Sequence, residues 1–185
     1  MLSLMKEFFA GMTTQMIVGN IIALVGSLVM VGLGFIKKKN HVLLGQCVQN
    51  VLLGTSNLIL GGVSGFITNV LTIIRNLIAV KVEFKLPLKL LFMAAQIALT
   101  AIFNNLGWVG WMPTVAACLF IWFLDTKSDL TMKIVVIVTQ VMWTIFDWTI
   151  CSYTTLLFDF FTMASNAVGI ILILRDNSNK RNAEE

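Results

Sequence analysis

Apolar runs of nearly constant length, separated by short polar breaks, fill most of the chain. An α-helix needs about 20 residues to cross the hydrocarbon core of a bilayer, and each run comes close to that length. Seven such runs can be drawn, at 16–36, 41–60, 62–80, 86–105, 107–124, 131–150 and 153–174. The pattern predicts an all-α integral membrane protein with seven transmembrane helices.

Two neighbouring runs, within 41–81, carry amides and hydroxyls at helical spacing. One face of the first run holds Gln46, Gln49, Asn50 and Asn57. One face of the second holds Asn69, Thr72 and Asn76, with Arg75 beside them. Polar side chains inside a membrane normally face other helices or a water-filled cavity. We therefore expect these two faces to line the protein interior or a polar cavity.

Composition agrees with a membrane protein. The chain has 185 residues, of which 58% are hydrophobic and 12% charged, and its mean hydropathy is +0.90. These values exclude an ordinary soluble domain. Residues 1–15 lack the small-residue cleavage site of a signal peptide, so we expect the first span to be retained. We interpret 1–15 as a segment at the membrane surface, with a disordered tail as the alternative.

The net charge of +4 is a topology signal and gives no indication of nucleic-acid binding. With helices of alternating direction, one side of the membrane receives all the basic residues except Lys6 and the intramembrane Arg75. The positive-inside rule makes that side cytoplasmic, with the N-terminus outside and the C-terminus inside. Four aromatic residues fall near the outer interface, where such rings are favoured: Trp108, Trp111, Trp148 and Tyr153. Eleven of the thirteen basic residues fall on the cytoplasmic side: Lys37, Lys38, Lys39, Lys81, Lys85, Lys89, Lys127, Lys133, Arg175, Lys180 and Arg181.

Nothing in the chain indicates an enzyme. The predicted outer loops, at 61–62, 105–107 and 151–152, leave no room for an extramembrane catalytic domain. The sequence contains no Gly-rich phosphate loop and no H-E-x-x-H motif, and its one histidine lacks a partner cysteine. We expect no cofactor and no metal. The cysteines lie far apart without C-x-x-C spacing, which favours plain packing of Cys47, Cys118 and Cys151.

A faint internal repeat relates the first three helices to the last three. Gln46 corresponds to Gln140 in the outward-running helix, and Asn69 corresponds to Asn166 in the returning helix. The repeat predicts a 3+1+3 arrangement of two parallel triple-helix units, at 16–80 and 107–174, joined by a linker helix at 86–105. Residues 175–185 would form a cytoplasmic tail.

Three stretches carry a family resemblance: GVSGFITNVLTIIRNLI at 62–78, MPTVAACLFIWFLDTKSDLTMK at 112–133, and the segment from WTIFDW to SNAVGIIL at 143–172. Over nearly its whole length the chain resembles a YgjV-type bacterial inner-membrane protein, most specifically at the 130–133 loop and at Ile74 and Arg75. That family is similar in helix pattern to the SWEET, PQ-loop and PnuC transporters, which implies three-helix units around a central solute site. The chain departs from those relatives because it has no Pro-Gln pair, and the resemblance does not name a solute.

The resemblance implies that Asn69 and Asn166, at equivalent mid-membrane positions, bind substrate. An amide offers donors and an acceptor to a neutral hydroxylated or amide-bearing solute, and the alternative role is hydrogen bonding between helices. Trp143 shares a face with Gln140 and offers a stacking surface for a ring, although core packing is the alternative. The complete predicted substrate site is Asn69, Asn166, Gln46, Gln49, Asn50, Gln140, Trp143, Asp159 and Arg75.

Asp147 and Asp159 are the only carboxylates clearly inside the predicted spans. A charge at mid-membrane costs about 2.5 to 3.5 kcal/mol on insertion scales, so each needs water or a partner. Asp147 lies about one turn from the outer boundary, and we interpret it as hydrated. Asp159 is deeper, and it is a candidate proton site or substrate contact, with an ion pair to Arg75 as the structural alternative. Arg75 has the further alternative of reaching the headgroups with its long stem.

We predict a facilitative carrier that moves a neutral polar metabolite, such as a sugar, nucleoside or vitamin, by alternating access. Its partners would be that solute and the lipid bilayer, with homo-oligomerisation left open. Because no second deep carboxylate is evident, we expect passive transport. The alternative function is a membrane receptor or scaffold that binds a partner without translocation. A cavity lined by Asn69, Asn166 and Asp159 would favour the carrier, and a packed centre would favour the scaffold.

Overall fold

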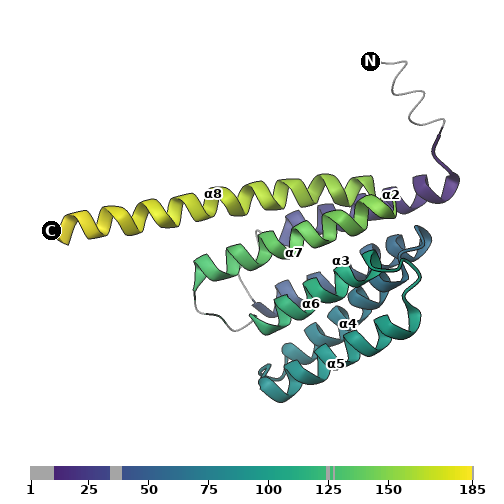
Figure 1. The fold of residues 1–185 in the computed structure, drawn as a ribbon, viewed down its shortest axis with the longest axis horizontal. Coiled ribbons are helices and arrows are strands. Elements are labelled where there is room, and N and C mark those ends of the chain that lie inside the picture. Colours follow the sequence, from purple (N-terminus) through teal and green to yellow (C-terminus); the bar gives the residue numbers. More distant parts are fainter. Residues whose placement is uncertain (1–10, 34–38, 124–125, 127, 185) are drawn as a thin grey trace.

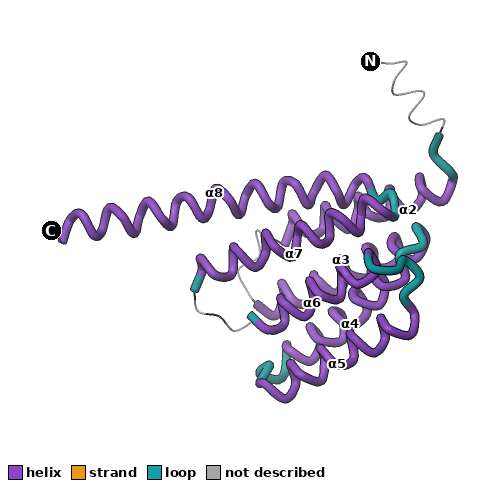
Figure 2. The backbone as a smooth tube through the Cα atoms, in the orientation of Figure 1, coloured by secondary structure: helices purple, strands orange, loops and turns teal. Residues whose placement is uncertain are grey.

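The computed structural model describes residues 11–33, 39–123, 126 and 128–184 (Figures 1 and 2). Over this part the chain is all-helical, with seven α-helices, one 3-10 turn and no strand. The helices are α2 (Thr14–Leu33), α3 (Lys39–Ile59), α4 (Val63–Ala79), α5 (Leu86–Phe103), η1 (Val109–Trp111), α6 (Met112–Trp122), α7 (Asp129–Thr149) and α8 (Tyr153–Glu184).

The helices fall where the apolar runs predict them. Five of them are long and apolar enough to cross a membrane: α2, α3, α5, α7 and α8. The remaining two predicted spans are shorter, at 17 residues for α4 and 11 for α6, which the three residues of η1 precede. At the other extreme, α8 continues to Glu184, so the predicted tail is helical. The predicted surface segment falls largely on residues 1–10, which lie outside the described part.

Local sequence signals set the helix ends. The Thr13 hydroxyl accepts a hydrogen bond from the Met16 N–H at the start of α2, at 3.3 Å, and Ser128 caps α7 in the same way. Pro87 and Pro113 occupy the first turns of α5 and α6, where a missing N–H costs nothing. Gly61 has a φ of +84° in the α3–α4 turn, a conformation that glycine adopts without strain.

Contacts between helices divide the molecule into two groups. In one group α3 packs against both α2 and α4, and in the other α7 packs against both α6 and α8. The groups meet where α2 contacts α8 and where α4 contacts α6. Helix α5 lies at the margin of the bundle against α4 and α6 (Figure 1). The Lys89 ammonium of α5 donates to the Trp122 carbonyl at the end of α6, at 3.0 Å.

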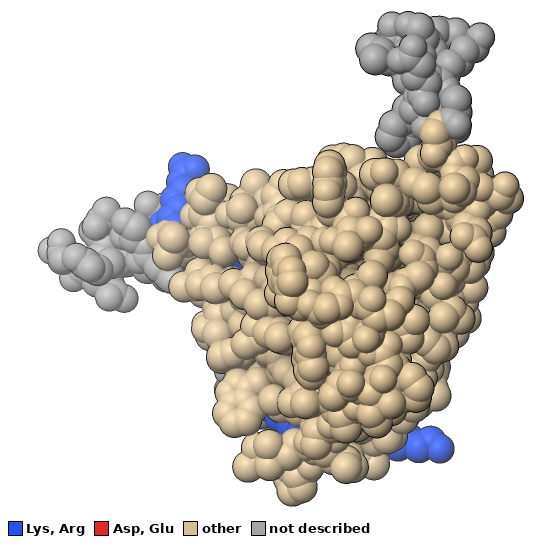
Figure 3. Space-filling model, turned by 45° about the vertical axis from the view of Figure 1, so that its right-hand side comes forward, with Lys and Arg blue, Asp and Glu red and all other residues tan. Residues whose placement is uncertain are grey.

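The polarity of the fold is the reverse of a soluble domain. Large apolar side chains cover the outside, among them Ile21, Leu91 and Ile171, each more than half exposed. The face drawn in Figure 3 is almost entirely tan, with small patches of Lys and Arg and no visible Asp or Glu among the residues that the structure describes. The interior holds many fully buried polar side chains, including Ser27, Ser56, Asn76, Gln96, Thr100 and Thr114. An apolar exterior around a polar interior is the arrangement that a bilayer favours.

Glycines allow helices to approach closely at the centre. A Cβ added at Gly65 of α4 would lie 2.6 Å from the ring of Phe146 on α7, and that ring is completely buried. A Cβ at Gly19 of α2 would lie 2.7 Å from Leu60. The neighbouring Ser56 hydroxyl of α3 donates to the Gly19 carbonyl at 2.8 Å. Small residues at such contacts are typical of helix packing in membranes.

Candidate functional site

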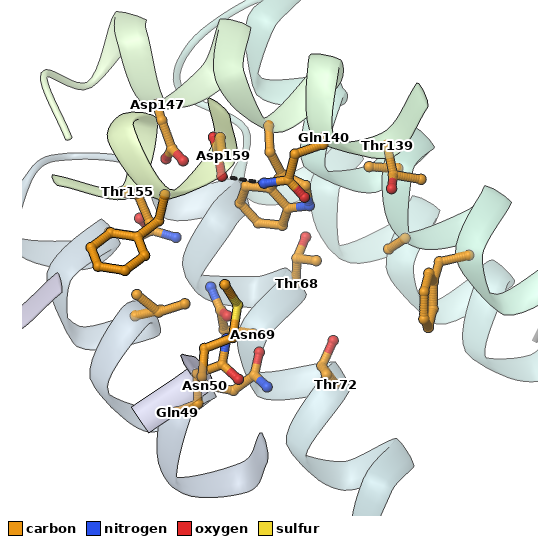
Figure 4. Close-up of a pocket in the computed structure, with 18 of the residues that line it drawn as sticks. Gln49, Asn50, Thr68, Asn69, Thr72, Thr139, Gln140, Asp147, Thr155 and Asp159 are labelled. Atoms are coloured by element: carbon orange, nitrogen blue, oxygen red, sulfur yellow. Dashed lines mark hydrogen bonds between the residues drawn. The ribbon is translucent and has the colours of Figure 1, made fainter. Parts of the chain in front are cut away.

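A cavity of about 250 Å³, here called the central cavity, lies between the two groups of helices (Figure 4). Helices α2, α3, α4, α6, α7 and α8 all contribute to its wall, whereas α5 contributes no residue. Its polar wall consists of Ser27, Gln49, Asn50, Asn57, Thr68, Asn69, Thr72, Arg75, Thr139, Gln140, Asp147, Thr155 and Asp159. The cavity therefore gathers polar groups from both helix groups into one space.

Helix α4 presents a continuous polar stripe to this cavity. Thr68, Asn69, Thr72 and Arg75 follow one another at helical spacing along it, and all four line the wall. The Asn69 amide donates to the Gly65 carbonyl of its own helix at 2.8 Å and is 5% exposed. Because this bond uses one of its two N–H groups, Asn69 keeps a donor and its carbonyl for a solute.

A buried hydrogen-bond network supports this stripe from behind. The Gln96 amide of α5 donates to the Thr68 hydroxyl at 2.6 Å and to the Thr114 hydroxyl of α6 at 3.2 Å. Thr114 is in turn 2.6 Å from the Thr100 hydroxyl. Gln96, Thr100 and Thr114 are each no more than 1% exposed. The network fixes α4, α5 and α6 relative to one another.

Two carboxyl groups meet at the α7–α8 wall of the cavity. Asp147 is 2% exposed and Asp159 is 5% exposed, and both line the central cavity. Figure 4 shows them side by side, with Gln140 donating to Asp159. The Thr144 hydroxyl is 3.5 Å from the other Asp159 oxygen. The Asp147 Oδ1 atom is buried without a hydrogen-bond partner.

Arg75 is not the partner of these carboxyls. Its guanidinium donates to the Asn76 side-chain oxygen at 3.1 and 3.2 Å and lies 5.6 Å from the centre of the Phe120 ring. The expected alternative of an ion pair between Arg75 and Asp159 is therefore wrong. The Arg75 side chain is 8% exposed, so it does not extend into the headgroup region.

A second cavity, here called the loop cavity, adjoins the first. It has a volume of about 780 Å³ and is bounded by α3, the end of α4 and the loop that leads to α5. Arg75 and Phe120 line both cavities. Lys81, Glu83 and Lys85 line the loop cavity and are exposed. The Arg75–Phe120 contact therefore stands between the central cavity and the basic end of the molecule.

Most residues of the predicted site share the central cavity, but two do not. Gln46 lines the loop cavity and accepts a hydrogen bond from the Asn76 amide at 3.0 Å. Asn166 is absent from both linings, and its amide donates to the Thr162 carbonyl of its own helix at 2.9 Å. Seven line the central cavity: Gln49, Asn50, Asn69, Arg75, Gln140, Trp143 and Asp159.

Sequence reasoning missed two features of the site. The interpretation of Asp147 as hydrated near the outer boundary is wrong, because this residue is only 2% exposed and lines the central cavity. The Gln96 network was not anticipated either. The signal for Asp147 was present in the sequence, since Gln140, Thr144 and Asp147 fall at i, i+4 and i+7 on one face of α7.

A comparison with protein families matches most of the chain. The family model named Imp-YgjV, described as "Bacterial inner membrane protein", matches residues 17–177. No match was found among curated proteins or among solved structures. The expected likeness to the SWEET, PQ-loop and PnuC transporters stays a prediction.

Proposed function

The chain belongs to the Imp-YgjV family of bacterial inner membrane proteins, and from this premise we propose that it is a multi-pass carrier. It would move a small, neutral polar solute across the inner membrane by alternating access. The solute site would be the central cavity, with Asn69, Gln49, Asn50 and Gln140 as the principal hydrogen-bonding groups.

The observation that carries this proposal is a polar cavity in the middle of an apolar bundle. Burying amides, hydroxyls and carboxyls in a membrane is costly, and such groups mark solute and ion pathways. The volume of about 250 Å³ lies just below the roughly 300 to 1,000 Å³ typical of small-molecule pockets. A solute of the size of a sugar or a small vitamin fits these dimensions better than a peptide does.

The arrangement of helices supports a rocking mechanism. The helix contacts favour two triple-helix units, α2–α4 and α6–α8, with α5 as a linker outside the site. Transporters built from repeats bind their solute at the interface between the repeats and expose it by moving one against the other. In this proposal Arg75 and Phe120 close the central cavity toward the loop cavity and separate when the units move.

A receptor or scaffold that does not translocate a solute is the alternative function. Such a protein has no need for a hollow centre, and a packed interior would favour it. The central cavity gives the carrier the stronger support.

Thermal unfolding of the purified protein tests the proposal. Melting temperatures would be measured against a panel of sugars, nucleosides and vitamins, because a ligand at 100 times its Kd stabilises a protein by about 2.7 kcal/mol. We expect one chemical class to raise the melting temperature and to exchange across the membrane of proteoliposomes. A class that stabilises the protein without crossing the membrane would favour the receptor, and the absence of any shift would contradict the carrier.

A further inference from the structure

The two buried carboxyl groups of Asp147 and Asp159, here called the carboxyl pair, cannot both be ionised at low energetic cost. The two carboxyl groups lie side by side on the wall of the central cavity (Figure 4). An ionised carboxylate can only accept hydrogen bonds, so two adjacent carboxyl groups can bond to each other only when one of them carries a proton. Both groups are almost completely buried. Two adjacent negative charges would also repel each other strongly in a low-dielectric interior. The geometry of the pair is therefore that of a site holding one proton.

The surroundings of the two carboxyls are unequal. Asp159 receives hydrogen bonds from Gln140 and Thr144, which favour its ionised form. Asp147 receives no such support, and its Oδ1 atom is buried without a partner. A charge on Asp147 would thus be uncompensated, whereas a proton on Asp147 allows it to donate to Asp159.

Few other charged or titratable groups face the pair. Helix α2, which packs against α8, has none within its described length, and Cys118 of α6 lines a separate apolar cavity. On the two helices of the pair, Asp129, Lys133 and Arg175 lie toward the opposite ends, and Tyr153 lies at the start of α8. Among the residues that the structure describes, Arg75 of α4 is the one other charged residue on the wall of the central cavity. Among the described residues no third His, Cys, Asp or Glu completes a metal-binding group.

We propose that the carboxyl pair Asp147 and Asp159 is a proton-binding site in the wall of the central cavity, and that it couples solute movement to a proton. The coupling rests on the proposed carrier function, whereas the proton site does not. In one conformation the pair takes a proton from water on one side, and in the other it releases that proton to the opposite side. This inference replaces the passive transport expected from the sequence, because Asp147 supplies a second buried carboxyl group beside Asp159.

Infrared spectroscopy of the purified protein tests the site without any solute. We expect the wild-type protein to show a protonated carboxylic acid band at neutral pH, and the double variant Asp147→Asn/Asp159→Asn to lose it. Asp129→Asn, which changes an exposed carboxylate at the start of α7, should keep the band. Absence of the band in the wild type, or its persistence in the double variant, would overturn the proposal.

A second variant keeps the test decisive if the double variant does not fold. Gln140→Met removes a hydrogen-bond donor from Asp159 while keeping an unbranched side chain, so it should shift the frequency of the acid band. An unshifted band would place the proton elsewhere and refute the assignment. A failed solute screen would leave these spectra unchanged, so failure of the carrier and failure of the proton site are distinguishable.

Coupling is tested in proteoliposomes with a solute selected by the thermal screen. With the membrane potential clamped, symport of one proton per neutral solute sustains about a tenfold concentration ratio per pH unit. We expect the wild type to accumulate solute under a pH gradient, and Asp159→Asn to lose this gradient-driven accumulation. Equal accumulation with and without the gradient in the wild type would refute coupling.

Discussion

Asn69 and Asn166 make the same local hydrogen bond in different surroundings. Each amide donates to the carbonyl four residues earlier on its own helix, but only Asn69 lines the central cavity. Neither bond joins two helices, so removing either side chain should cost little stability. We predict that Asn69→Ala abolishes the ligand-induced rise in melting temperature, whereas Asn166→Ala, a matched control, retains it.

Both results would come from the thermal screen in the absence and presence of the selected solute. The resemblance to sugar carriers implies instead that both variants lose binding. Loss of the ligand shift in Asn166→Ala, with the melting temperature of the free protein unchanged, would favour that earlier interpretation over the observed geometry.

Gln96 is a residue whose importance is structural. Its amide satisfies hydroxyls on two other helices in a fully buried position. Gln96→Ala would leave Thr68 without this donor and open a void beside Thr114. We predict a loss of about 1 to 3 kcal/mol in the free energy of unfolding, measured by denaturant titration in detergent. Thr55→Ala, at an exposed hydroxyl bonded within its own helix, should change stability far less.

Helical periodicity could predict which helix faces are polar, but it could not predict how completely each polar side chain is buried in the protein. The spacing of Gln49, Asn50 and Asn69 places them on the faces that line the cavity. Asp147 has an equally clear phase on α7, yet its burial depends on how the α7–α8 turn packs against α2. That packing involves residues more than 130 positions apart in the chain, such as Asn20 and Cys151. A pattern within one helix carries no information about it.

At the scale of elements, Asn20 of α2 clamps the α7–α8 turn. Its amide donates to the Cys151 carbonyl at 2.9 Å, and its side-chain oxygen accepts from the Thr154 N–H at the start of α8 at 2.9 Å. It therefore caps α8 from another helix. The clamped residue Cys151 has a φ of +59°, which is uncommon for a residue other than glycine. The clamp thus holds a strained turn in place.

Removal of this clamp should be visible at Cys151 itself. We predict that Asn20→Ala lowers stability by about 0.5 to 2 kcal/mol, as loss of a helix cap does, and speeds maleimide labelling of Cys151. Labelling would be followed in a background with Cys47 and Cys118 changed to Ala, so that one thiol is counted. An unchanged labelling rate would mean that the turn is held by other contacts.

The starts of the helices were the most predictable features, whereas α8 runs ten residues beyond its predicted end at 174. Turn residues at 61–62 and 151–152 set the break between α3 and α4 and the break between α7 and α8 to within a residue or two. The apolar run at 107–124 instead forms η1 and a short α6. Gly107 has a φ of +56°, and a 3-10 turn precedes Pro113. Hydropathy alone does not register such backbone geometry.

At the scale of the whole molecule, the basic and aromatic ends predict orientation in the membrane. Exposed Lys81 and Lys85 lie at one end, and Trp108 and Trp148, about two-thirds exposed, lie at the other. We predict that a cysteine at Lys85 is protected from an impermeant thiol reagent in intact cells, whereas one at the exposed Asn105 reacts. Lys38 and Lys127, which the pattern of basic residues also places on the cytoplasmic side, fall outside the described residues.

These measurements need a background without native cysteines. Reaction at Lys85 together with protection at Asn105 would reverse the predicted orientation, with the N-terminus then cytoplasmic.

The assembly of the central cavity could not be predicted from the sequence. Six helices contribute to its wall, and each contribution depends on the rotation that its neighbours impose.

The short helices α4 and α6 have a consequence for the surrounding lipid. At 1.5 Å per residue, the 17 residues of α4 extend about 25 Å, and α6 with η1 is shorter still, against a hydrocarbon core of about 30 Å. Val115 and Trp122 of α6 are exposed at the surface, so acyl chains must shorten to match them. Hydrophobic mismatch of this kind favours thinner bilayers. We predict that the melting temperature in proteoliposomes rises as lipid acyl chains are shortened from 18 toward about 14 carbons, and a flat or opposite dependence on chain length would show that the bilayer does not adapt to α6.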